Sequence, residues 1–246
     1  MTREFSHTYY LAAGECDAQR RMPVTLLVGR LIEIASLHAN SWGVGYRDLI
    51  TDDCGWVLSR LTVEMQSTPE VDRDYTITTW VETYNRHYSQ RCFEVTDTAT
   101  GTTLGYARSI WMVLDIKHRT AVDVTRLESL RDKACDRPCP IAPQSRLSPI
   151  ATPTRTSTYT VRYTDCDFYR HMNTVRYVEL LMNQFDLSFH DNHTLSRLEL
   201  TFVRETQYNT SLTVLIDDSE ASDVKLQLDD SQGTTHLRAR MMFGNV

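Results

Sequence analysis

Two aspartates, a histidine and an asparagine fall within one short stretch of the chain, Asp165-Cys166-Asp167-Phe168-Tyr169-Arg170-His171-Met172-Asn173. Carboxylate and imidazole side chains can transfer protons. Apolar residues then recur at steps of three and four, which predicts an amphipathic helix from Asn173 to His190. Asp165, Asp167 and Asn173 are candidate capping residues. The backbone N–H groups at such a helix start can also receive an anion or a polarised carbonyl oxygen.

The same stretch has a counterpart earlier in the chain. Glu15–Met22 lies 150 residues before Asp165–Met172, and the Cys, Asp, Arg and Met positions agree in register. Two further matches follow in the same order: Leu58-Ser59-Arg60-Leu61 with Leu195-Ser196-Arg197-Leu198, and Gly101-Thr102-Thr103 with Gly233-Thr234-Thr235. Such an ordered set indicates one unit duplicated in tandem, with shorter loops in the second copy.

Composition limits the classes of protein that fit. The chain has 246 residues, enough for two domains of roughly a hundred residues each. A net charge of -6 gives no support for nucleic-acid binding. The opening residues lack the apolar core of a signal peptide, and no apolar run is long enough to span a membrane, so we expect a cytoplasmic protein. The six cysteines form no framework, so we expect reduced thiols. We also expect no metal and no cofactor.

Each copy reads as one helix followed by strands. In the first copy a strand over 5–13 precedes a helix from Pro23 to Trp42. Runs rich in β-branched and aromatic residues predict the remaining strands, at 56–65, 75–84, 91–98 and 104–114, and in the second copy at 156–163, 197–204, 212–216, 224–228 and 234–243. An antiparallel sheet that curls round one helix buries its apolar stripe, which indicates an α+β fold.

A proline-rich segment separates the copies. Five of the seven prolines fall between Pro138 and Pro153, and such a segment sustains neither a helix nor a central strand. We therefore predict an N-terminal domain over 1–134, a linker over 135–153 and a C-terminal domain over 154–246. Cys135 and Cys139 flank the start of the linker, but no second pair completes a tetrahedral zinc site. We interpret His190–His193 as a polar loop rather than as a metal pair.

The two copies differ where chemistry is expected. Asp17 matches Asp167, so this aspartate can serve the scaffold in both copies. By contrast, Arg21 stands in the place of His171, and Thr68 stands in the place of Glu205. His171 and Glu205 can converge if a strand end crosses the helix start, and a carboxylate with an imidazole can orient a water as general base. A buried His–Glu hydrogen bond without any reaction fits the spacing equally well.

At these residues the sequence resembles a known family. The pattern Asp165-x-Asp167-x3-His171-Met172-Asn173-x3-Tyr177, followed by Arg204-Glu205, resembles the C-terminal signature of the acyl-ACP thioesterases, and Trp56-Val57-Leu58-Ser59-Arg60 resembles their N-terminal domain. The resemblance implies a double hotdog fold, two tandem repeats each of a central helix wrapped by an antiparallel sheet. It also implies catalytic roles for Asp167, His171 and Glu205. The family's asparagine two residues after the aspartate is Tyr169 here. Its frequent cysteine after the glutamate is Thr206, which favours direct attack by water.

The resemblance further implies hydrolysis of a fatty acyl thioester carried by acyl carrier protein (ACP), without a cofactor. Tyr169 and Asn173 become candidate substrate-binding residues. The first helix is free to line a slot for the acyl chain, with Leu27, Leu31, Ile34 and Trp42 as candidates to set its length. An acidic chain must meet an acidic carrier through a local positive patch, and the candidates are Arg155, Arg162, Arg170, Arg176 and Arg204.

Two other functions fit the same residues. A hotdog thioesterase that acts on acyl-CoA shares this type of motif, and a double hotdog that binds an acyl chain without turnover is a third reading, for which Tyr169 is the best argument. A homodimer is compatible with the sequence, which does not fix the oligomeric state.

Overall fold

The computed structural model describes residues 3–130 and 132–246, and they form two compact units. The first unit runs to Pro23 and from Gly29 to Pro143, and the second comprises Gln144–Val246 together with Val24–Val28. No helix in the described part of the chain is long and apolar enough to cross a membrane.

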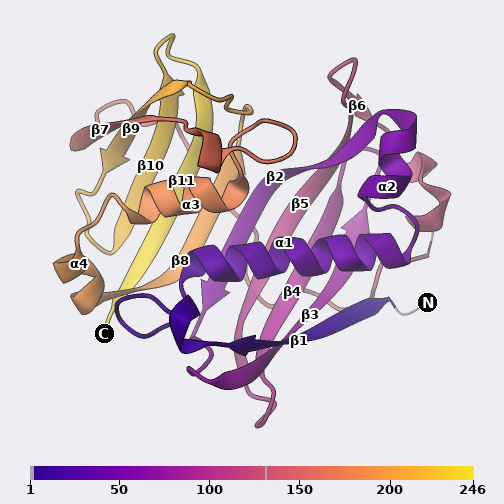
Figure 1. Ribbon diagram of the computed structural model, residues 1–246, viewed down its shortest axis with the longest axis horizontal. Helices are drawn as coiled ribbons and strands as arrows, with labels where there is room; N and C mark the ends of the chain where they lie inside the picture. Colours follow the sequence, from indigo (N-terminus) through magenta and orange to yellow (C-terminus); the bar gives the residue numbers. More distant parts are fainter. Residues whose placement is uncertain (1–2, 131) are drawn as a thin grey trace. The chain divides into compact units, whose positions relative to one another are not determined.

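The first unit is an antiparallel sheet, and most of one long helix, α1 (Val24–Ser41), lies across one face of it (Figure 1). Its strands follow the order β1-β3-β4-β5-β2, with β6 beside β5. A short helix, α2 (Tyr46–Leu49), follows α1. The strand bounds are β1 Glu4–Leu11, β2 Cys54–Met65, β3 Arg73–Tyr84, β4 Ser89–Asp97, β5 Thr103–Asp115 and β6 Thr120–Val122.

The second unit repeats this plan. Its sheet has the order β8-β11-β10-β9-β7, and helix α3 (Thr174–Met182) lies across one face (Figure 1). A second short helix, α4 (Leu187–Asn192), precedes β8. The strand bounds are β7 Arg155–Thr160, β8 His193–Phe202, β9 Ser211–Asp217, β10 Asp223–Asp230 and β11 Thr235–Asn245.

Most predicted elements are confirmed, and two are wrong. The helix predicted from Pro23 to Trp42 is α1, and each predicted strand is present within a few residues of its bounds. The single helix predicted from Asn173 to His190 is instead two helices, because Asp186 caps a new start by accepting a hydrogen bond from the Phe189 amide (2.8 Å). The break lets Phe185 and Phe189 both pack against Phe243 of β11, with ring centroids 5.3 and 4.9 Å away.

The predicted polar loop over 190–193 is the second error. His190, Asp191 and Asn192 end α4, and His193 already begins β8. The imidazoles of His190 and His193 bond backbone carbonyl oxygens of Met182 and Phe189, at 3.2 and 2.9 Å. They therefore serve local packing.

The predicted linker over 135–153 is held to the sheets at several points. In the first unit the Cys135 amide donates to Val81 O (2.8 Å), and the Cys139 amide donates to Glu82 (2.9 Å). In the second unit Gln144 bonds Thr201 (2.6 Å). Glu199 alternates with core-facing leucines on β8 and is nevertheless buried, where it pairs with Arg197 at 2.7 Å.

All six cysteines are free. Among the described residues, no group of three or more His, Cys, Asp or Glu side chains is arranged to hold a metal.

Candidate active site

The loop before α3 is a tight turn organised by Asp167. One carboxylate oxygen, Oδ1, accepts hydrogen bonds from the amides of Tyr169 (2.9 Å) and His171 (3.2 Å). The Asp167 amide in turn donates to His171 O (2.8 Å), and Arg170 takes a left-handed conformation with φ 67°. This turn fixes the backbone of His171, so the carboxylate of Asp167 positions the histidine through its peptide group.

The first unit contains the same turn without the histidine. Asp17 Oδ1 accepts from the amides of Gln19 (3.0 Å) and Arg21 (2.8 Å), and Arg20 has φ 59°. The repeated aspartate is therefore a structural element of both units. The titratable group it positions, His171, is present only in the second.

The segment that carries Glu205 lies beside this turn. The Met172 amide donates to Thr206 O (2.8 Å), and an isolated β-bridge pairs His171 with Gln207. These contacts place His171 Nε2 3.5 Å from Glu205 Oε2, so the structure brings together the two groups that the sequence predicts to converge. Both side chains stay partly accessible, at 19% and 29% of their surface, so a small reactant can reach them.

Asn173 begins α3. Its side chain accepts a hydrogen bond from the Val175 amide (2.8 Å), so it is the N-cap predicted for this helix. Asp165, the other capping candidate, instead caps the short turn before it, where Oδ2 accepts from the Arg162 amide (2.6 Å) and the Tyr159 hydroxyl (2.8 Å). The amide of Thr174 makes no hydrogen bond to any described residue, so one N–H at this helix start remains for a ligand oxygen.

Tyr169 stands within the turn. Its amide bonds Asp167, its ring packs at 4.1 Å between centroids against Phe168, and its side chain is half-buried. These contacts place the phenol near the turn that carries His171. Its predicted part in substrate binding stays a prediction.

A group of residues behind Glu205 escapes sequence-based prediction. Thr206 bonds the Tyr177 hydroxyl (2.6 Å) and His236 Nδ1 (2.8 Å), and His236 Nε2 lies 3.4 Å from Asp230 Oδ2. Burial raises the pKa of Tyr177 to about 12. His236 lies on β11 and shares no spacing with His171 or Glu205, so only the strand pairing brings it here.

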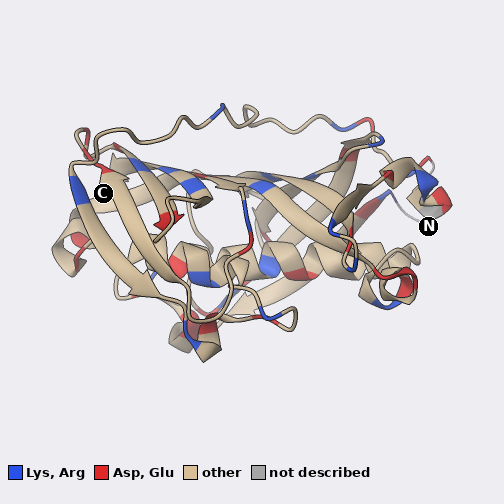
Figure 2. Cartoon of the chain, turned by 90° about the horizontal axis from the view of Figure 1, so that it is seen from above, with Lys and Arg blue, Asp and Glu red and all other residues tan. Residues whose placement is uncertain are grey.

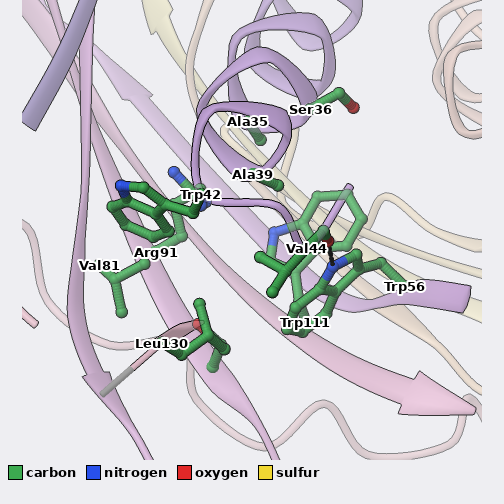
Figure 3. A pocket seen from close by; sticks show the side chains of 11 residues that line it. Ala35, Ser36, Ala39, Trp42, Val44, Trp56, Val81, Arg91, Trp111 and Leu130 are labelled. Carbon is green, nitrogen blue, oxygen red and sulfur yellow. Dashed lines mark hydrogen bonds between the residues drawn. The ribbon is translucent and has the colours of Figure 1, made fainter. Parts of the chain in front are cut away.

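The first unit holds an apolar cavity beside α1 (Figure 3). The cavity volume is about 50 Å³. This is several times the roughly 10–15 Å³ that one water molecule needs. Its lining comes from α1, from the residues that follow α1, from the sheet and from a turn near the end of the unit: Ala35, Ser36, Ala39, Trp42, Val44, Trp56, Val81, Ser89, Arg91, Trp111 and Leu130. Trp42, one of the predicted acyl-binding residues, therefore lines the cavity. Leu27, Leu31 and Ile34 are buried but do not line it.

One charged group borders this cavity. Arg91 is buried, and its Nη1 lies 3.0 Å from His38 Nδ1 and donates a hydrogen bond to Thr79 Oγ1 (3.2 Å). Burial lowers the pKa of Arg91 to about 10, so the guanidinium remains charged at neutral pH.

Comparison with known proteins assigns the family. Residues 2–128 match the model of the acyl-ACP thioesterase N-terminal domain, and residues 150–245 match that of the acyl-ACP thioesterase C-terminal domain. This chain belongs to the acyl-ACP thioesterase family. Its site residues thus lie in a family of thioester hydrolases.

Individual relatives agree with this assignment. The Arabidopsis thaliana protein named oleoyl-acyl carrier protein thioesterase 2, chloroplastic, is 25% identical over 253 residues, which covers 94% of this chain and 67% of that protein. A crystal structure of an acyl-ACP thioesterase from Bacteroides thetaiotaomicron superposes with a TM-score of 0.91 at 27% identity and covers 98% of both chains. The 12:0-ACP thioesterase from Umbellularia californica superposes with a TM-score of 0.88 at 21% identity, over 100% of this chain and 99% of that one. The fold is a double hotdog, as the family resemblance implies.

Proposed function

We propose that this member of the family hydrolyses fatty acyl-ACP thioesters with Glu205 as the general base. The main support is the approach of His171 Nε2 to Glu205 Oε2 at 3.5 Å beside the start of α3. The first unit keeps the turn of Asp17 but has Arg21 and Thr68 at the equivalent positions. A pair that served only the scaffold would be expected in both units, so its restriction to one favours chemistry.

In the proposed reaction, Glu205 removes a proton from a water molecule whose oxygen attacks the thioester carbonyl carbon. The carbonyl oxygen gains charge as the tetrahedral intermediate forms, and we assign its stabilisation to the Thr174 N–H at the positive end of α3. The carbon–sulfur bond then breaks, and the leaving thiolate takes up the proton. The products are a free fatty acid and the carrier thiol.

The remaining predicted residues receive supporting roles. His171 orients the water or the substrate through a hydrogen bond, and Asp167 holds His171 by bonding its amide. Asn173 keeps the helix start in register by capping it. We assign Tyr169 to the rim of the substrate site, where its phenol can donate or accept a hydrogen bond.

We further propose that the cavity in the first unit receives part of the acyl chain. Three tryptophans and several aliphatic side chains give it an apolar lining (Figure 3). Ala35 and Ala39 of α1 and Trp42, directly after it, face the cavity, whereas Leu27, Leu31 and Ile34 of α1 are buried in the core. The charged Arg91 at its border disfavours an apolar chain end. This combination makes the cavity a candidate determinant of chain length.

The acidic carrier is proposed to meet a basic patch beside the site. Charges of both signs are interspersed along each unit (Figure 2), so a local patch must supply the attraction. Arg155 and Arg176 are already paired with Asp218 and Glu179. Arg162, Arg170 and Arg204 are exposed and make no ion pair with a described residue. The backbone bonds Met172 N to Thr206 O and Asn209 N to Val161 O hold their two segments together. We call these three arginines the basic patch.

The test is turnover with matched acyl-ACP and acyl-CoA that carry the same acyl chain. Hydrolysis of acyl-ACP with a higher kcat/KM than acyl-CoA supports the proposal. A preference for acyl-CoA would favour the alternative hotdog thioesterase, and binding without turnover of either would favour an acyl-binding protein. The named plant relatives are chloroplastic, whereas we propose a cytoplasmic location for this chain. Fractionation with an antibody against the native protein tests that point.

A further inference from the structure

Four side chains that the proposed reaction does not use form a chain of hydrogen bonds behind Glu205. The Tyr177 hydroxyl donates to Thr206 Oγ1 (2.6 Å), Thr206 Oγ1 lies 2.8 Å from His236 Nδ1, and His236 Nε2 lies 3.4 Å from Asp230 Oδ2. Thr206, Tyr177 and His236 are exposed by only 0%, 3% and 5%. We call these four residues the Thr206 network. Its members come from α3, from the segment after β8, from β11 and from the end of β10.

The charge of Asp230 determines which nitrogen of His236 donates a hydrogen bond to it. The amides of Thr234 and Gln232 donate to its Oδ1, and the bond from Thr234 is the leading cause that lowers the pKa of this carboxyl. An ionised carboxylate only accepts hydrogen bonds, so His236 Nε2 must donate to it. The opposite nitrogen, Nδ1, then faces the segment that carries Glu205.

His236 Nδ1 reaches two consecutive residues there. It lies 2.8 Å from Thr206 Oγ1 and 3.1 Å from the carbonyl oxygen of Glu205. A neutral imidazole accepts the Thr206 hydroxyl proton at this nitrogen, and an imidazolium donates to the Glu205 carbonyl oxygen. Either form holds the same short piece of backbone. The amides of Val203 and Arg204 also donate to the carbonyl oxygen of His236, at 2.8 and 3.2 Å.

Thr206 is thus held from two directions. Its carbonyl oxygen accepts from Met172, next to His171, and its hydroxyl group joins Tyr177 of α3 to His236 of β11. We propose that Thr206 is a positioning residue that, together with His236 and Asp230, fixes the Glu205 carboxylate at its distance from His171. This inference rests on the proposed function, because it assigns the network to the geometry of the general base.

The expected fall in kcat follows from how strongly the rate depends on the position of the catalytic carboxylate. A displacement of about 1 Å at a reacting group costs on the order of a hundredfold in rate. Thr206→Val keeps the branched shape and removes the hydroxyl, so kcat should fall about 10- to 100-fold while KM changes less than about twofold. Thr206→Ser restores the hydroxyl and should return kcat to within about threefold of the native value. Thr201→Val is the matched control. Thr201 lies on β8, five residues before Thr206, and its hydroxyl accepts a hydrogen bond from Gln144 and takes no part in the Thr206 network.

A second measurement does not depend on turnover. In the intact protein labelled with ¹⁵N-histidine, the Nδ1 signal of His236 should move in Thr206→Val and stay unchanged in Thr201→Val. Asp230→Asn provides a second variant if Thr206→Val folds poorly, because the amide oxygen can still accept the turn bonds of Oδ1 while the charge facing His236 is lost. It should lower kcat about tenfold with little change in KM.

The outcomes are separable. A native kcat in folded Thr206→Val, an equal loss in Thr206→Ser, or an unmoved Nδ1 signal would overturn the positioning role. Native turnover by Glu205→Gln would instead refute the general base, and the NMR result would still report whether the network exists.

Discussion

Asp17 and Asp167, which lie 150 residues apart, accept backbone hydrogen bonds in two equivalent turns, one in each unit of the chain. Each carboxylate accepts from the amides two and four residues later, and each turn contains an arginine with positive φ. The aspartate thus belongs to the duplicated scaffold. The units differ in the residue that the turn presents, Arg21 or His171, and the proposed reaction uses only His171.

Replacing each aspartate by alanine should separate the contribution of the turn to stability from its contribution to turnover. Asp17→Ala and Asp167→Ala should each lower the free energy of unfolding by about 1–2 kcal/mol, because each frees two backbone N–H groups. Only Asp167→Ala should also lower kcat, by roughly tenfold or more, because only that turn positions His171. Urea unfolding and steady-state kinetics on both variants give the comparison. Equal kinetic losses at the two positions would show that the effect is one of general stability.

Charge reversal in the basic patch should weaken use of the carrier-bound substrate. Arg162→Glu combined with Arg170→Asp should lower kcat/KM for acyl-ACP by about 10-fold or more at low salt, and the loss should shrink as salt is raised. Aspartate is chosen at Arg170 because it tolerates the left-handed conformation found there.

Two controls accompany this prediction. Hydrolysis of a short acyl-pantetheine, which lacks the carrier, should fall much less in the double variant than hydrolysis of acyl-ACP. Arg146→Glu makes the same change at an exposed arginine of the segment between the units and should leave acyl-ACP kinetics intact. A loss of equal size with acyl-pantetheine would argue against a docking role.

Filling the cavity should shorten the preferred acyl chain. Ala35 lines it from α1 and is 6% exposed, so Ala35→Leu adds volume where we place the acyl chain. The ratio of kcat/KM values for a long and a short acyl-ACP should fall by about 10-fold or more, since each excluded methylene is worth about 0.8 kcal/mol. The short substrate reports whether the variant folds and turns over. An unchanged ratio would remove this cavity from the acyl path.

Acid should weaken the second unit partly through Asp223. Arg240 donates from Nε and Nη2 to its two oxygens, at 2.7 Å each, and this bond is the leading cause that lowers the pKa of the carboxyl. The pKa of Asp223 is lower in the folded protein than in the unfolded chain, where it is near 3.9. The ion pair therefore stabilises the fold fully at pH values above about 3.9, and this stabilisation is lost as the pH falls through the pKa of the folded protein.

Removing the arginine should therefore act in a pH-dependent way. Arg240→Met should lower the free energy of unfolding by about 1 kcal/mol at pH 7, and the difference from the native protein should shrink as the pH falls below 4. Lys225→Met serves as the comparison, because its pair with Asp217 is longer, at 3.6 Å, and half-exposed. A difference independent of pH would assign the effect to lost packing of the arginine stem.

Much of this fold follows from short-range patterns. The β-branched runs mark the strands, and the 3.6-residue stripe marks α1, because burial against one sheet face sets both periods. The break between α3 and α4 could not be read in the same way. Phe185 and Phe189 continue the helical spacing, and the break at Asp186 depends on its capping bond together with the packing of both rings on Phe243, more than fifty residues later.

The site residues also fall into those that the sequence could identify and those that only the folded structure brings together. His171 and Glu205 could be singled out because the duplication shows what replaces them in the other copy. His236 has no such signal, because its approach to Thr206 depends on the register between β8 and β11. Arg91 likewise looks like any strand residue until the sheet places it at the cavity border.

The most direct test concerns Glu205 itself. Glu205→Gln keeps the shape of the side chain and removes its charge, so the rate of acyl-ACP hydrolysis in a single turnover should fall by roughly two to four orders of magnitude. Binding of acyl-ACP, measured separately at equilibrium, should stay within about threefold of native. Near-native hydrolysis by a folded Glu205→Gln protein would contradict the proposal that this carboxylate activates water.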